Sequence, residues 1–259
     1  MSFHDWLYSV YPPNSSFDGK YKAFHILTMV FIVVAAVAIT YFLRSKKEKH
    51  RYTVLVVISS VILLLEITRR IVAFTKGDSL DFTLAMRALL PRPWCAISCW
   101  ILMIATLVRK KFMYNLAACN GIVCALVFFA YPSVGFNNTV ILFENVYSIV
   151  THTMLMLGAI LCITLKFTSF KYYEGSLRKS AIWELLSMVI IFAYAFIEIY
   201  VLKIEADPLY FRSGNEVQDF LGCSYPVYLL IYSGFLIFYF NLFYIIDGLV
   251  RRRKLKKSA

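Results

Sequence analysis

Long apolar segments alternate with short polar connections along the whole chain. An α-helix needs about 20 apolar residues to cross the hydrocarbon core of a bilayer. Seven segments come close to this length or exceed it: 23–43, 52–74, 91–108, 112–131, 140–165, 181–202 and 225–246. The pattern therefore predicts an all-α fold, a polytopic membrane bundle of seven transmembrane helices.

Basic residues fall on alternate connections between these segments. Four clusters, at 44–51, 109–111, 166–179 and 251–257, contain most of the 27 Lys and Arg residues. Connections rich in Lys and Arg stay on the cytoplasmic side of a membrane. We therefore expect an external amino terminus and a cytoplasmic carboxyl terminus. The predicted parts are an external interfacial segment (1–22), a seven-helix membrane domain (23–246) and a basic cytoplasmic tail (247–259), in an integral protein of the plasma membrane.

The composition agrees with a membrane protein. Hydrophobic residues make up 60% of the chain and charged residues 16%, whereas soluble domains have about 25% charged residues. The net charge of +12 lies in short clusters beside apolar segments, so it indicates topology and no nucleic-acid partner. The expected partners are membrane lipids, and the oligomeric state stays open. The six cysteines lack the spacing of a metal site, so neither a metal nor another cofactor is expected.

Several ionisable or nucleophilic side chains lie inside the predicted helices. An ionisable group there costs at least ~2.5 kcal/mol on insertion scales, so each one is a functional hypothesis. The basic residue at the inner end of each helix marks the cytoplasmic edge, and depth increases by ~1.5 Å per residue from there. The estimates define two levels in the outer half: ~21 Å for Cys95, His152 and Glu66, and ~28 Å for His25, Arg70 and Glu198.

A purely structural role is an alternative for each of these residues. Glu66 has the i, i+3 and i+4 spacing of a same-helix ion pair with Arg69 and Arg70, and such a pair is as compatible with stability as with catalysis.

The two histidines and Glu198 also have alternatives. His152 is compatible with a hydrogen-bonded packing residue and His25 with an interfacial one. Glu198 is compatible with a side chain that reaches the interface from a helix end.

Cys95 has a more specific setting. Pro91 and Pro93 favour a helix start, which places Cys95 in the first turn of its helix. The positive end of the helix dipole and a nearby imidazole favour a thiolate there, whereas burial in apolar surroundings would make the thiol inert. The unpaired amides of that turn are potential donors to an oxyanion. A reactive Cys95 thiolate therefore requires His152 to lie next to Cys95. We expect Cys95 to be a free thiol and not to pair with Cys223, which precedes the last predicted helix near the interface.

These residues resemble the YwaF-type integral membrane proteins and their eukaryotic relatives, the transmembrane protein 164 family of phospholipid acyltransferases. The likeness rests on His25, on Leu-Pro-Arg-Pro-Trp-Cys at 90–95, and on His152. It implies that Cys95 is the acyl-accepting nucleophile and His152 its base. The bacterial pattern has His where this chain has Pro93, which leaves open a divergent or inactive member, or a position that only caps the helix.

The leading hypothesis is a lipid acyltransferase or acyl hydrolase with a Cys95–His152 pair in a polar cavity of the outer leaflet. The other polar residues would have supporting roles: His25, Glu66 and Glu198 in the site, and Arg69 and Arg70 in binding a lipid phosphate. The rival is a non-enzymatic transporter, ligand-sensing protein or assembly protein in which the same polar level is a binding site.

Overall fold

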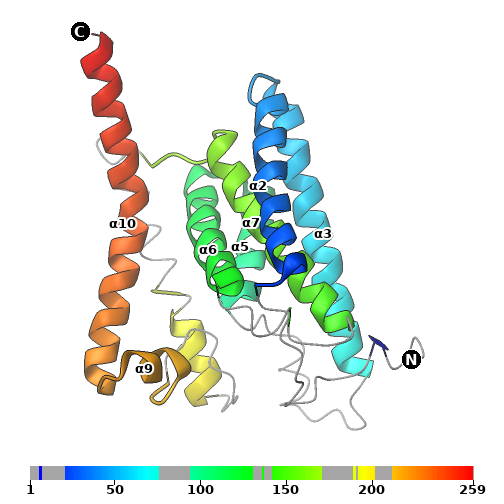
Figure 1. Cartoon of the computed structure of the whole chain (residues 1–259), viewed down its shortest axis with the longest axis vertical. Coiled ribbons are helices and arrows are strands. Elements are labelled where there is room, and N and C mark those ends of the chain that lie inside the picture. The colour runs from blue at the N-terminus through cyan, green and yellow to red at the C-terminus, as the bar shows by residue number, and fades with distance from the viewer. Residues whose placement is uncertain are drawn as a thin grey trace. The chain divides into compact units, whose positions relative to one another are not determined.

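The structure, a computed structural model, describes residues 6–7, 21–75, 94–130, 136, 142–170, 189–190, 192–201 and 212–258. All regular elements in these ranges are helices, which confirms the all-α prediction (Figure 1). Four of them are long and apolar enough to cross a membrane: α2 (Ala23–Leu43), α6 (Lys111–Ala130), α7 (Phe143–Thr164) and Tyr225–Val250 of α10. The count of seven membrane helices and the orientation of the termini stay predictions.

The remaining elements are α3 (Glu48–Thr75), α5 (Trp94–Val108), the π-helical η1 (Ile197–Val201), α9 (Glu216–Leu221) and α10 (Tyr225–Ser258). The largest differences from the predicted bounds are at the start of α3 and the end of α10, which both extend into charged sequence. Lys, Arg and Glu are good helix formers, so these helices continue beyond their apolar parts. Residues 1–5, 91–93 and most of the predicted helix 181–202 lie outside the described residues.

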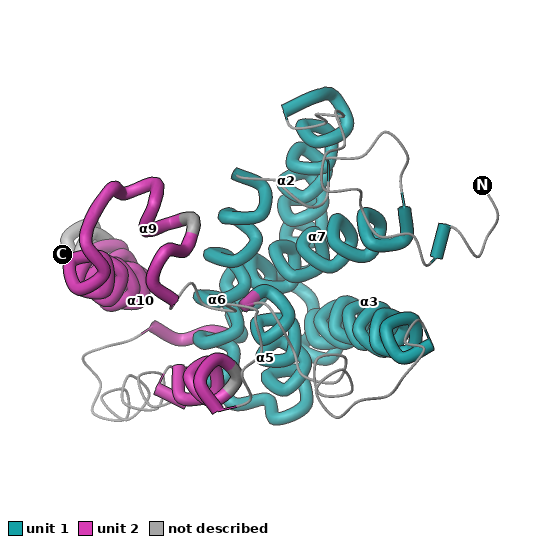
Figure 2. Tube along the Cα trace, turned by 90° about the horizontal axis from the view of Figure 1, so that it is seen from below, with its two compact units in different colours: residues 1–91, 95–167 teal, residues 92–94, 168–259 magenta. Residues whose placement is uncertain are grey.

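The chain divides into two compact units (Figure 2). The first contains residues 1–91 and 95–167, and the second contains residues 92–94 and 168–259. In the first unit, α7 packs against α6, α3 and α2. In the second, α9 contacts α10. The predicted site residues, except Glu198, therefore belong to the first unit, with α7 at its centre.

Two glycines allow the helices around α7 to approach closely. A Cβ atom added at Gly121 of α6 would lie 2.8 Å from the Cβ of Ala159 in α7. One added at Gly158 of α7 would lie 2.7 Å from a methyl group of Leu102 in α5. Small residues at helix contacts are typical of membrane bundles, where close backbone approach supplies the packing energy. These contacts fix the position of α7, which carries His152.

The first unit has two polar ends. At one end, the last turns of α3 meet the first turns of α7, where a hydroxyl group of α7 bonds to Glu66. We call this the Glu66 end. At the other, the first turns of α3 and α6 meet the ends of α5 and α7 around a cavity with basic side chains. We call this the basic end.

Candidate functional site

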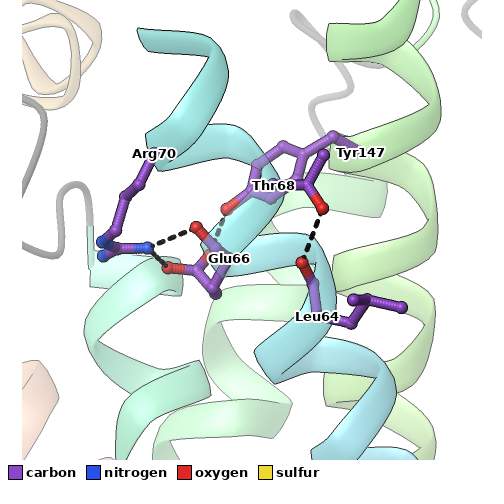
Figure 3. Close-up of polar contacts among 5 residues, drawn as sticks. All are labelled: Leu64, Glu66, Thr68, Arg70 and Tyr147. Atoms are coloured by element: carbon purple, nitrogen blue, oxygen red, sulfur yellow. Dashed lines mark hydrogen bonds and ion pairs between the residues drawn. The ribbon is translucent and has the colours of Figure 1, made fainter. Parts of the chain in front are cut away.

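Glu66 is the centre of the polar site, and its side chain is fully buried. Nη1 of Arg70 lies 2.5 Å from Oε2 of Glu66 and also donates to the Glu66 carbonyl oxygen at 2.9 Å (Figure 3). The hydroxyl of Tyr147 in α7 donates to the other carboxylate oxygen (Figure 3). Buried charges are normally paired and hydrogen-bonded, and here both carboxylate oxygens have partners. The same-helix ion pair predicted from the spacing is confirmed, with Arg70 as the partner.

Nearby hydroxyl groups differ in what they bind. Thr68 is close to Glu66 in sequence, but its hydroxyl donates to the Leu64 carbonyl of its own helix at 2.8 Å (Figure 3). Tyr147 is therefore the hydroxyl that ties α7 to the Glu66 carboxylate.

Aromatic rings from two other helices hold the arginines. The guanidinium carbon of Arg69 lies 5.2 Å from the centre of the Tyr147 ring, and that of Arg70 lies 5.3 Å from the Trp100 ring. Cations over aromatic faces gain electrostatic stabilisation, more so away from water. Sequence reasoning missed Tyr147. It lies as far from Lys166 along the sequence as Arg70 lies from Arg51, so the depth estimate would have found it had it included tyrosines.

Cys95 belongs to the same end of the unit. Helix α5 begins at Trp94, so Cys95 does lie in its first turn, as predicted. Its thiol is free and half-buried. The backbone amides of Cys95 and Ala96 are close to the sulfur, and Arg69 and Glu66 interact with it electrostatically. A thiol, a cation and a carboxylate from two helices are thus brought together.

His152 has a defined tautomer. Its Nδ1 lies 2.7 Å from the Ser148 carbonyl oxygen, which can only accept, so Nδ1 carries the hydrogen and the neutral ring has its lone pair on Nε2. The ring stacks on Phe128 with centroids 3.7 Å apart. Within the described residues no hydrogen bond joins His152 to Cys95. Their catalytic pairing therefore stays a prediction.

His25 is fully buried at the start of α2. Its Nδ1 accepts the backbone N–H of Tyr21 at 3.0 Å, and its ring lies 4.5 Å from that of Phe136. Phe136 in turn lies 6.1 Å from Phe128, the ring that stacks on His152. One aromatic cluster therefore contacts both histidines.

Glu198 lies in η1 of the second unit, and its side chain is outside the described residues. The part of the chain that the structure describes contains no group of three or more His, Cys, Asp and Glu residues able to hold a metal ion.

The fold and the site define an integral membrane protein with a buried polar cluster. Helix α2 supports this class because it is strongly apolar and yet mostly exposed, as expected of a helix that faces lipid. The family model of the TMEM164 family matches residues 20–244, and the chain belongs to that family. No curated protein and no solved structure matches the chain. The more specific likeness to YwaF-type proteins stays a prediction.

Proposed function

We propose that the protein is a lipid acyltransferase or acyl hydrolase that acts from the outer leaflet of the plasma membrane, with Cys95 as its nucleophile. The observation that carries the proposal is the setting of Cys95: a free, half-buried thiol in the first turn of α5, beside Arg69. A helix amino terminus and a neighbouring cation favour a reactive thiolate, and they act against the burial of the thiol, which disfavours it.

The reaction has two steps. Cys95 attacks the carbonyl carbon of a lipid ester, a C–S bond forms, and the C–O bond to the lipid alcohol breaks. The thiol proton passes to Nε2 of His152 and then to the departing alkoxide. The hydroxyl of an acceptor, or of water, next attacks the thioester and releases the thiol. The backbone amides of Cys95 and Ala96 in the first turn of α5 stabilise the oxyanion in both steps.

The charged neighbours have different roles in this proposal. Arg70 is held by Glu66, whereas Arg69 lies near Cys95, so we assign recognition of the lipid phosphate to Arg69. Glu66 already accepts hydrogen bonds from Arg70 and Tyr147. We therefore assign Glu66 to holding the arginines in position and leave the orientation of His152 to the Ser148 carbonyl.

The test uses purified protein in vesicles of defined phospholipid, with mass spectrometry of the protein and of the lipids. We expect an acyl adduct on Cys95 and its loss, together with acyl transfer, in Cys95→Ala. Cys223→Ala is the matched control, because Cys223 is also a free, half-buried cysteine. Cys95→Ser should be nearly inactive because a hydroxyl is the weaker nucleophile.

His152 is tested in the same assay. His152→Gln should lower the rate by at least ~100-fold, as for loss of a general base. The double variant should be about as slow as the slower single variant, since the two groups act as one unit. Absence of an acyl adduct on Cys95, or lipid turnover that survives Cys95→Ala, would overturn the proposal. The polar cluster would then be the binding site of a transporter, sensor or assembly protein.

A further inference from the structure

The basic end of the first unit has an open cavity of about 760 Å³. It is formed by the first turns of α3 and α6 and by the ends of α5 and α7. Five cationic side chains line it, and Glu48 is its single acidic one. The cations are Lys49, Arg51, Arg109, Lys111 and Lys166. The cavity therefore has a strong excess of positive charge.

Two of these cations are held in place by uncharged partners. The guanidinium carbon of Arg109 lies 3.8 Å from the centre of the Tyr52 ring. Nη1 of Arg51 donates to the Leu165 carbonyl oxygen at the end of α7, at 2.8 Å. Among the residues that the structure describes, no carboxylate forms an ion pair with any of the five. Their charge is therefore available to a ligand.

Two buried donors in the cavity wall lack partners. Tyr114 is 3% exposed, its ring packs 5.3 Å from that of Phe167, and its hydroxyl forms no hydrogen bond within the described part of the chain. Nε of Arg51 is also buried without an acceptor in that part. Buried polar groups are nearly always paired, so such exceptions call for an explanation. Both atoms belong to residues that line the cavity, and a ligand with acceptor oxygens satisfies them once the two side chains turn toward it.

The backbone also favours this site. Arg109 and Lys166 have φ angles of +56° and +67° at the ends of α5 and α7. Left-handed positions that follow a helix usually have glycine, because a Cβ atom is unfavourable there. Two cavity-lining positions therefore have long cationic side chains where the backbone favours none. Strained residues of this kind concentrate at functional sites.

We propose that this cavity binds a phosphate monoester group. Arg and Lys side chains only donate hydrogen bonds, and a phosphate monoester offers acceptor oxygens with up to two negative charges. Basic pockets at the ends of membrane helices suit lipid headgroups, and the positive-inside rule predicts that this end faces the anionic cytoplasmic leaflet. A soluble phosphate shares the same chemistry. The cavity lies at the basic end and does not include Cys95, so binding there does not require acyl transfer.

The test is a thermal-unfolding titration of the full chain in phosphatidylcholine nanodiscs. A ligand that binds the folded state raises the unfolding temperature. We expect phosphatidic acid, a phosphate monoester lipid, to raise it clearly more than phosphatidylserine does. Inorganic phosphate is added in a separate arm. A rise with both means that the site accepts soluble phosphate, and a rise with phosphatidic acid alone assigns the lipid headgroup. No rise with either overturns the proposal.

Variants locate the site. Tyr114→Phe and Arg51→Gln should each weaken the response to phosphatidic acid by about tenfold, as for loss of a hydrogen bond to a charged group. Lys46→Gln is the control, because Lys46 is an exposed cation between α2 and α3 that does not line the cavity. If Arg51→Gln fails to fold, Tyr114→Phe decides, since it removes only a hydroxyl. Equal affinity in Tyr114→Phe, Lys46→Gln and the unchanged protein would overturn the proposal.

Discussion

The two ends of the first unit differ in whether their charged side chains have partners of opposite charge. At the Glu66 end, a buried carboxylate has partners on both oxygens, Arg70 from its own helix and Tyr147 from α7. At the basic end, the cations around the cavity lack carboxylate partners among the described residues, and the buried hydroxyl of Tyr114 has no acceptor there. A satisfied network stabilises the bundle by itself, whereas unpaired donors gain their partner from a ligand. The polar groups of the Glu66 end therefore stabilise the fold, whereas those of the basic end bind a ligand.

The largest expected effect is at the Glu66 end. Glu66→Gln leaves Arg70 without its carboxylate, and loss of one member of a fully buried pair costs ~3 to 5 kcal/mol. Arg70 is 14% exposed, so the lower part of that range is expected. Arg70→Gln should be similar, and the double variant should lose less than the sum because the two substitutions remove one interaction. The free energy of unfolding in detergent micelles measures all three.

Replacement of a charged residue by Gln at the basic end is the control for charge removal. Lys111 is exposed and lines the cavity, so Lys111→Gln should change the free energy of unfolding by no more than ~0.5 kcal/mol without ligand. Strictly additive losses for Glu66→Gln and Arg70→Gln would show that the Glu66 end contains no energetic pair.

Two tyrosines allow the comparison at smaller scale. Tyr147→Phe removes a hydrogen bond to the Glu66 carboxylate, and such bonds to charged groups contribute ~1.5 to 3 kcal/mol. Tyr114→Phe removes a buried hydroxyl that has no partner among the described residues, so stability should stay equal or increase. In a thermal-unfolding measurement without anionic lipid, Tyr147→Phe should therefore lower stability and Tyr114→Phe should not. A loss of similar size at both positions would mean that the Tyr114 hydroxyl does have an acceptor.

The sequence predicted the features that depend on local pattern. The bounds of α2 coincide with the apolar segment 23–43, because a polar or basic residue flanks it on each side. The Glu66–Arg70 pair followed from spacing on one helix. Tyr147 was missed because it is one of 18 tyrosines, and aromatic residues near helix ends are typical of membrane interfaces.

Features that depend on the packing of several helices could not be predicted from local sequence patterns. The basic clusters indicate topology, and no local pattern indicates that residues near 51, 109, 114 and 166 surround one cavity. The burial of His25 likewise depends on Phe136, which belongs to a distant part of the sequence. Helix packing, and not hydropathy, determines both.

The smallest effect concerns the backbone of Lys166. A cationic residue occupies a left-handed position there, at a cost in stability. A left-handed conformation costs a residue with a Cβ atom ~1 to 2 kcal/mol, and glycine avoids this cost. Glycine also increases the entropy of the unfolded chain, which offsets ~0.4 to 1 kcal/mol. Lys166→Gly should therefore raise stability by up to ~1 kcal/mol, whereas Lys166→Ala removes the same charge but keeps the Cβ atom and should not. The difference between the two variants isolates the backbone term, and both should respond less to phosphatidic acid. If glycine is no more stable than alanine at this position, the backbone is not strained, and the basic end differs from the Glu66 end in its unpaired side chains alone.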